Sequence, residues 1–349
     1  MRARPPARDF TARTGVALSV LDQSPVVSGS TAADALRESV ALAVEAERLG
    51  YRRYWLAEHH GTSGLAGSAP EIMIARVAAA TSTIRVGSGG VLLSHYSPLK
   101  VAEVFRVLYG LFPGRIDLGI GRAAGASPRA AGALRTGREG DDPAQFARQV
   151  TDLVGFLAGT LPADHPWSGV AAVPEGPGGP DVWLLASSSD GAGLGAALGL
   201  SLCFAHFITP AYGPQVVAKY RRHVLASADR DRLQASVAVS VICAGTDAEA
   251  ERLATSLDVW RLTPQVDRGP LPSVEEAQIH ALTEMDRARI IQNRARLVVG
   301  GPARVRQALV ALAEAFAVNE LVVLTICHDP QARRRSYELL AEAFELTPT

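Results

Sequence analysis

Several apolar segments of the sequence end in side chains that could carry out acid–base chemistry. Glu58, His59 and His60 end one such segment, and an imidazole there can accept or donate a proton near neutral pH. Adjacent residues of a strand point to opposite sides, so only one of the two histidines can face a pocket. A buried, hydrogen-bonded histidine is the alternative interpretation. His206 and His328 end two later segments and compete for the same role.

Three consecutive serines could bind an anion. Ser187, Ser188 and Ser189 precede a glycine-rich stretch with a helical pattern, and hydroxyls beside the unpaired N–H groups of a helix start favour phosphate. Glycine disfavours a helix by up to about 1 kcal/mol relative to alanine. The close approach of a ligand would therefore explain Gly191 and the glycines after it. The alternative is an ordinary N-cap by Asp190 with tight helix packing.

Arg122 follows a further apolar segment and could bind a phosphate or a polar ring. The pattern G-x-G-x-x-A, typical of dinucleotide-binding turns, occurs at 119–124 and again at 191–196. Neither copy is followed, about twenty residues later, by an acidic residue at the end of a strand. NAD binding of that type is therefore disfavoured. No spacing of cysteines and histidines resembles a zinc site, and we expect no metal.

The composition is that of a folded protein with a large core. The chain has 349 residues, of which 48% are hydrophobic and 20% charged, which excludes disorder as the main state. Basic and acidic residues both number 35, a balance that indicates neither a nucleic-acid nor a membrane partner. The widely spaced cysteines indicate reduced thiols in a cytoplasmic protein. Residues 1–15 lack an apolar run, so we expect a disordered tail rather than a secretory signal.

Eight apolar segments alternate with helical patterns from residue 16 to the end. The predicted strands are 16–21, 53–58, 85–93, 115–121, 181–187, 202–207, 236–244 and 320–326. Such alternation implies a parallel sheet, and eight strands close a (β/α)8 barrel over 16–349, with an open doubly wound sheet as the alternative. Insertions are expected after the fourth strand and, over 262–295, after the seventh. A barrel would gather the polar residues above at the carboxyl ends of its strands.

The motifs together resemble those of bacterial luciferase-like flavin monooxygenases. The resemblance is carried by ERLGYRRYWLAEHHG, IRVGSGGVLLSHYSP, FPGRIDLGIGRA and VWLLASSSDGAGLGAALG. It extends over about residues 18–343 and is nearest to stand-alone enzymes related to polyketide-biosynthesis monooxygenases. It implies a barrel that takes reduced FMN (FMNH2) from a separate reductase, forms a flavin C4a-hydroperoxide with O2 and oxygenates a small organic substrate. It further implies a homodimer with a role in secondary metabolism.

The resemblance also implies roles for individual positions around the flavin. His59 falls on the histidine that stabilises the peroxyflavin or acts as acid or base. Ser88, Gly89 and Gly90 fall beside the isoalloxazine ring, with a cis peptide between the two glycines. The residues expected to hold the phosphate end and the adjoining part of the ring are Arg122, Ala123, Ser187, Ser188, Ser189 and Gly191.

Other positions are expected to shape the substrate side, and departures from the relatives leave alternatives open. By position, Trp55, His206, Phe207 and Met285 are expected to contact the substrate, and 262–295 corresponds to a mobile lid. At the phosphate loop, Asp190 adds a negative charge, and Gly191 stands where the relatives have a residue with a hydroxyl group. The alternatives are therefore hydride transfer with coenzyme F420 or a flavin-binding protein without turnover.

Overall fold

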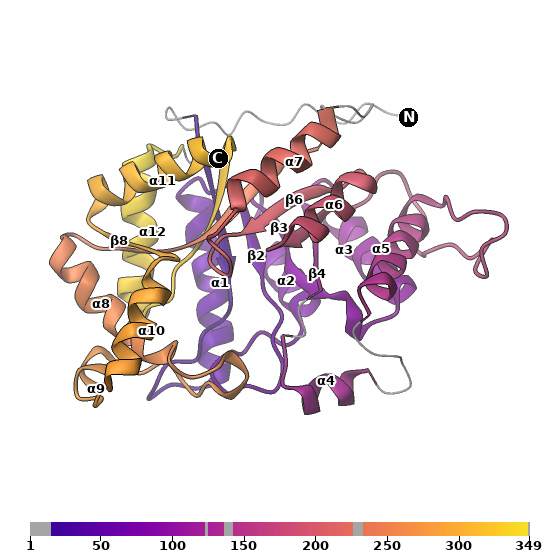
Figure 1. Cartoon of the computed structure of the whole chain (residues 1–349). Coiled ribbons are helices and arrows are strands. Elements are labelled where there is room, and N and C mark those ends of the chain that lie inside the picture. Colours follow the sequence, from indigo (N-terminus) through magenta and orange to yellow (C-terminus); the bar gives the residue numbers. More distant parts are fainter. Residues whose placement is uncertain (1–14, 123–124, 136–141, 226–232, 348–349) are drawn as a thin grey trace.

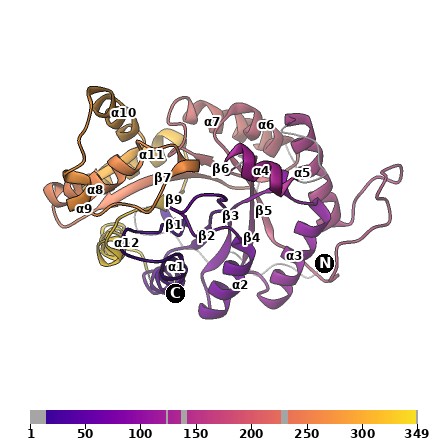
Figure 2. The ribbon, with the colours of Figure 1, turned by 90° about the horizontal axis from the view of Figure 1, so that it is seen from below.

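The computed structural model describes residues 15–122, 125–135, 142–225 and 233–347. Except for Gly15, the expected N-terminal tail lies outside these residues. Among the residues described, no helix is long and apolar enough to cross a membrane. Eight parallel strands form a closed ring with helices outside it, as Figures 1 and 2 show. The ring closes because β9 pairs with both β7 and β1. The predicted (β/α)8 barrel is confirmed.

The strands of the ring lie close to the expected segments. They are β1 (Ala17–Asp22), β2 (Arg53–Leu56), β3 (Arg85–Leu92), β4 (Ile116–Gly121), β5 (Asp181–Ala186), β6 (Ser201–Ala205), β7 (Ala235–Cys243) and β9 (Glu320–Leu324). A ninth strand, β8 (Leu297–Gly300), was not expected. It extends the sheet by pairing with the carboxyl-terminal half of β7, from Ser240 to Cys243, beyond the point where β6 ends.

Nine helices described by the structure follow the pattern of the sequence. They are α1 (Ala32–Arg48), α2 (Pro70–Ala80), α3 (Pro98–Leu111), α5 (Pro143–Ala158), α6 (Ser189–Ala197), α7 (Gly213–Leu225), α8 (Asp247–Trp260), α11 (Pro302–Phe316) and α12 (Pro330–Phe344). Local signals explain their first residues: Thr31 and Asp34 form a capping box at α1. Proline stands in the first turn of α2, α3, α5, α11 and α12, where its missing N–H costs no helical hydrogen bond.

The two insertions contain short helices that the sequence did not predict. The first insertion holds α4 (Pro128–Leu134), and the second holds η2 (Gln265–Asp267), α9 (Val274–Gln278) and α10 (Glu284–Arg294). A short 3-10 turn, η1 (Leu93–His95), follows β3. The segment that follows β2 hydrogen-bonds to both insertions, from His60 N to the Gly125 carbonyl and from Gly64 N to the Arg268 carbonyl, and in Figure 1 α4 and α9 lie below the labelled strands. Both insertions therefore lie at the carboxyl-terminal rim of the barrel.

The barrel interior is divided between an ionic layer and an apolar layer. At the start of the strands, Arg53 donates to Asp117 at 2.8 Å and to Glu320 at 2.5 Å, and all three side chains are buried. Above them, the interior side chains include Trp55 and Trp183, whose rings meet edge to face. Since these two layers fill the amino-terminal half, the open volume lies at the carboxyl ends of the strands.

Candidate active site

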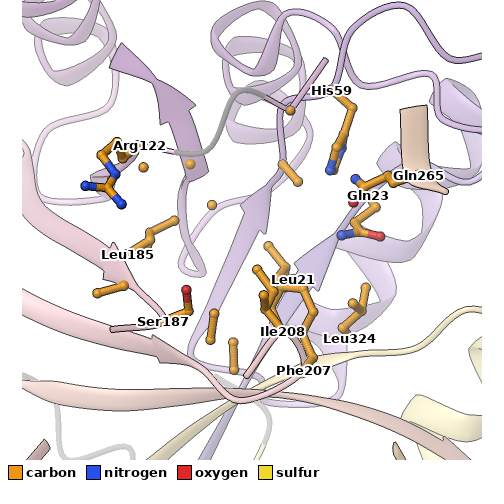
Figure 3. A pocket seen from close by; sticks show the side chains of 18 of the residues that line it. Leu21, Gln23, His59, Arg122, Leu185, Ser187, Phe207, Ile208, Gln265 and Leu324 are labelled. Atoms are coloured by element: carbon orange, nitrogen blue, oxygen red, sulfur yellow. The ribbon is translucent and has the colours of Figure 1, made fainter. Parts of the chain in front are cut away.

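A cavity of about 840 Å³ opens at the carboxyl ends of the barrel strands. This volume is typical of a site for a small molecule or cofactor. Its floor includes the apolar side chains of Leu21, Trp55 and Leu324, and Figure 3 shows Leu21 and Leu324 in this position. The segment after α8, beginning at Leu262, also contributes to the lining. The cavity is thus enclosed by the barrel and by the second insertion.

Gly89 and Gly90 line the cavity where β3 has no room for side chains. The peptide bond between them is cis, as expected from the resemblance. A Cβ atom on Gly90 would lie 2.7 Å from the carbonyl oxygen of Gly119, and one on Gly89 would lie 2.6 Å from Leu21 Cδ1. Ser88 does not line the cavity, because strand alternation turns its side chain away and its Oγ donates to the Gly119 carbonyl at 2.8 Å.

His59 is the imidazole that faces the cavity. Its side chain is buried, with 9% exposed, and its Nδ1 has no hydrogen-bond partner among the described residues. Burial lowers the pKa of His59 to about 4, with smaller contributions from the positive charges of His60 and Arg268. The ring is therefore neutral at pH 7. In Figure 3 it lies beside Gln23 and Gln265, two cavity residues that had no predicted role.

His60 points away from the cavity and belongs to a separate network. Its Nε2 lies 2.6 Å from Glu58 Oε1, which also accepts from the Tyr96 hydroxyl at 2.7 Å. The second Glu58 oxygen accepts from the backbone N–H of Leu92 at 3.0 Å. The prediction that one histidine of the pair faces the pocket is therefore confirmed. Through Glu58 and His60, the two chain neighbours of His59, the network joins the end of β2 to the end of β3.

The opposite side of the cavity can accept an anion. Figure 3 shows Arg122 and Ser187 there, across from His59. Arg122 has no ion pair or hydrogen bond to any residue that the structure describes, so its guanidinium is available to a ligand. The N-cap of α6 is Ser188, whose Oγ accepts from Gly191 N, and not Asp190 as the alternative interpretation had it. Ser188 also lines the cavity.

The other residues expected at the phosphate end differ in their surroundings. Ser189 is exposed outside the cavity lining, with its Oγ 3.4 Å from an oxygen of Asp190. Gly191 lines the cavity, and a Cβ on it would lie 2.8 Å from the Ala186 Cβ. Close packing of α6 on β5 therefore accounts for this glycine without a ligand. Ala123 lies outside the described residues.

The expected substrate residues divide into two groups. Trp55 and Phe207 line the cavity. His206 does not, because it packs edge to face on Phe316 outside the barrel, where burial lowers its pKa. Met285 is also outside, with 73% of its surface exposed. His328 does not line the cavity either, and its Nε2 lies 3.1 Å from Ser28 Oγ.

The cavity also has a set of arginines that sequence reasoning missed. The second insertion and the residues beside it contribute Arg261, Arg268, Arg289 and Arg296 to its lining. Arg289 lies on α10, whereas Arg296 lies two residues beyond the end of that helix. Helical spacing therefore does not link the two, and no local signal in the sequence marked them.

The chain is similar to known proteins over nearly its whole length. The model of the luciferase-like monooxygenase family matches residues 16–319. YceB of Bacillus subtilis, an uncharacterized protein, is 46% identical over 330 residues, which cover 94% of this chain and 99% of YceB. The N-acetyl-S-alkylcysteine monooxygenase of the same organism is 35% identical, with 94% and 98% covered. The crystal structure of apo-MsnO8 has a TM-score of 0.85 and 44% identity, with 96% and 100% covered.

Proposed function

The chain belongs to the luciferase-like monooxygenase family, and from this premise we propose that it uses reduced FMN and O2 to oxygenate a small organic substrate. The observation that carries the proposal is the buried Nδ1 of neutral His59, which has no partner among the described residues, in the cavity that also holds Arg122 and the Gly89–Gly90 segment. One cavity thus holds a group for proton transfer, a group for anion binding and a glycine segment without side chains.

The residues of the cavity fit a flavin phosphate ester. The guanidinium of Arg122, which no residue described by the structure engages, supplies donors for the phosphate together with Ser187 on the same side. Gly89 and Gly90 leave space beside an apolar floor where any Cβ would collide with its neighbours. Reduced FMN, when bound, supplies the electrons with which O2 is activated. The exposed carboxylate of Asp190 also lines the cavity and opposes the phosphate, which makes the contribution of Arg122 more important.

His59 is proposed to hold or transfer a proton at Nδ1 during oxygen transfer. A neutral ring can accept a hydrogen bond at one nitrogen and donate one at the other. Protonation would be costly at this buried position, so the ring returns to the neutral form after each transfer. Over 262–295, the second insertion is proposed to act as a lid that excludes water from the reacting groups.

The proposal includes partners that the family resemblance implies. A separate reductase would supply the reduced flavin, and the enzyme would act as a cytoplasmic homodimer in secondary metabolism. One relative is named for N-acetyl-S-alkylcysteine, a thioether. This name makes thioether sulfur a reasonable first acceptor to test.

The test of the reaction is isotopic. The protein, with a flavin reductase and FMN, would be incubated under 18O2 with a panel of thioethers, aldehydes and ketones. We expect one product to contain a labelled oxygen atom, with none incorporated from labelled water. If no compound takes up label while FMNH2 oxidises at its protein-free rate, the proposed reaction is wrong.

A binding test examines the phosphate end separately. Arg122→Ala should weaken FMN binding by tenfold to a hundredfold, because a hydrogen bond to a charged group contributes about 1.5–3 kcal/mol. Riboflavin lacks the phosphate, so its affinity should change less than threefold. Equal losses for both ligands would show that Arg122 does not contact the phosphate.

A further inference from the structure

A second group of positive charges faces the cavity from the side of the second insertion. Arg261 follows α8, Arg268 follows η2, Arg289 lies on α10 and Arg296 follows it. In the part of the chain that the structure describes, none of the four forms an ion pair. They donate hydrogen bonds to neutral oxygens, such as the Ser240 hydroxyl, 3.1 Å from Arg261 Nη2, and the Arg268 guanidinium also lies over the Trp260 ring, 4.9 Å from its centroid. We call these four residues the arginine cluster.

Asp258 and Glu251, two acidic groups near the end of α8, are already engaged with another arginine, Arg294. The charge of Asp258 raises the pKa of Arg261. Both oxygens of Asp258, however, accept hydrogen bonds from Arg294, at 2.8 and 2.7 Å. Glu251 also pairs with Arg294, at 3.0 Å. Among the described lining residues, five arginines face two carboxylates, Glu58 and Asp190, so the lining carries a net charge of plus three. Such an excess of one sign in a cavity favours an anionic ligand.

The cluster repels itself when no anion is present. Burial, and then the charges of Arg268 and Arg296, lower the pKa of Arg261 to about 10. Burial and then Arg296 lower the pKa of Arg268 to about 10. Arginine stays protonated at such values, so the repulsion persists at neutral pH. An anion bound between these groups would relieve it.

Asn293 provides an independent sign of a ligand. Only 8% of its surface is exposed, it lines the cavity, and its Nδ2 is buried without a partner among the described residues. Its Oδ1 accepts from Arg296 Nη2 at 2.7 Å, which fixes the amide with its N–H groups unused. A buried donor without a partner is costly, and an oxyanion in the cavity would satisfy it.

We propose that Arg261, Arg268 and Arg296, with Asn293, bind an oxyanion of the organic substrate: a carboxylate, sulfonate or phosphate ester. This inference rests on the proposed function, because it treats the cavity as holding a substrate beside the flavin. Gln265, which lies between Arg261 and Arg268 in the chain, is across the cavity from Arg122 and Ser187 in Figure 3. The oxyanion site is therefore assigned to the substrate and the opposite side to the cofactor phosphate.

The site also predicts how the rest of the substrate lies. Phe207, Ile208 and Leu324 give the same cavity an apolar surface, while Arg296 donates to the carbonyl oxygen of Ile208 at 3.1 Å. The anionic group is thus beside an apolar wall. The substrate class is an amphiphilic anion, with a hydrocarbon or aromatic part that the wall contacts.

Calorimetry with a matched pair of probes tests the site without flavin or O2. The probes are 2-naphthoate and 2-naphthamide, which share the same rings but differ in charge. We expect naphthoate to bind at least tenfold more tightly, with an affinity that falls as salt rises. Arg268→Gln and Arg296→Gln should each weaken naphthoate about tenfold and leave naphthamide within threefold. Equal binding of the two probes, or no binding of either, would overturn the proposal.

Two controls separate this site from the cofactor and from folding. Arg252→Gln changes an exposed arginine of α8 outside the cavity lining, and should leave naphthoate binding unchanged. FMN affinity should stay within threefold in the cluster variants, because the cofactor phosphate is assigned to Arg122. If FMN binding falls in them as much as in Arg122→Ala, the cluster holds the cofactor and the substrate assignment is wrong. Unchanged melting temperatures would show that the variants fold.

Discussion

Replacing His59 by glutamine should make the protein less sensitive to mild acid. The folded-state pKa of His59 is lowered from 6.5 to about 4, chiefly by burial. Below pH 6.5 the unfolded chain takes up the proton first, so the stability of the folded state is lost as the pH falls toward 4. For these two pKa values, linkage gives a loss of about 2 kcal/mol between pH 7 and pH 5. Glutamine does not titrate and lacks this contribution.

The assay is urea denaturation of both proteins at pH 8, 7 and 5. Other titrating groups are common to the two proteins and cancel when their free energies of unfolding are subtracted. The difference should change by no more than about 0.2 kcal/mol between pH 8 and pH 7, where histidine is mostly neutral in both states. It should then shift by about 2 kcal/mol in favour of the variant at pH 5. A shift below about 0.5 kcal/mol would refute the claim that burial keeps this ring neutral.

Further predictions concern the barrel interior. Arg53→Leu leaves Asp117 and Glu320 without their shared buried cation and should lower the free energy of unfolding by about 3–5 kcal/mol in urea. Gly90→Ala places a Cβ against a backbone oxygen and should cost about 1–3 kcal/mol. Its control, Gly110→Ala, lies in α3 with open space around it and should stabilise by about 0.5–1 kcal/mol. Burial raises the pKa of all three cysteine thiols to about 12, so a maleimide should label them only after unfolding.

The barrel was predictable because each parallel strand is buried on both faces. Such strands appear as short apolar segments, and the helices between them have clear first-turn signals. Strand β8 escaped notice because it has four residues and a single neighbour, β7. The short helices of the insertions were missed for a similar reason. In the second insertion, α9 and α10 have polar sequences without an apolar stripe, and their capping residues, such as Thr283, were the local signal of where they begin.

The site was predictable where strand alternation fixes the direction of a side chain. His59 and the Gly89–Gly90 segment follow from strand ends and from the family motifs. Alternation also shows why His206 was misplaced: Cys203 and Ala205 line the cavity, so the next residue faces outward. Met285 was misplaced because nothing local fixes which face of α10 meets the barrel. The arginine cluster could not be found by motif, since its members come together only when the insertion folds over the rim.

In the proposed function, this cavity controls how reduced FMN reacts with oxygen. The most direct measurement mixes the anaerobic protein–FMNH2 complex with O2 in a stopped-flow spectrometer and follows the flavin spectrum. We expect a spectrally distinct species before oxidised FMN appears, and a shorter lifetime of that species in His59→Gln at equal FMN occupancy. Oxidation with the same single-phase course as free FMNH2 would contradict it.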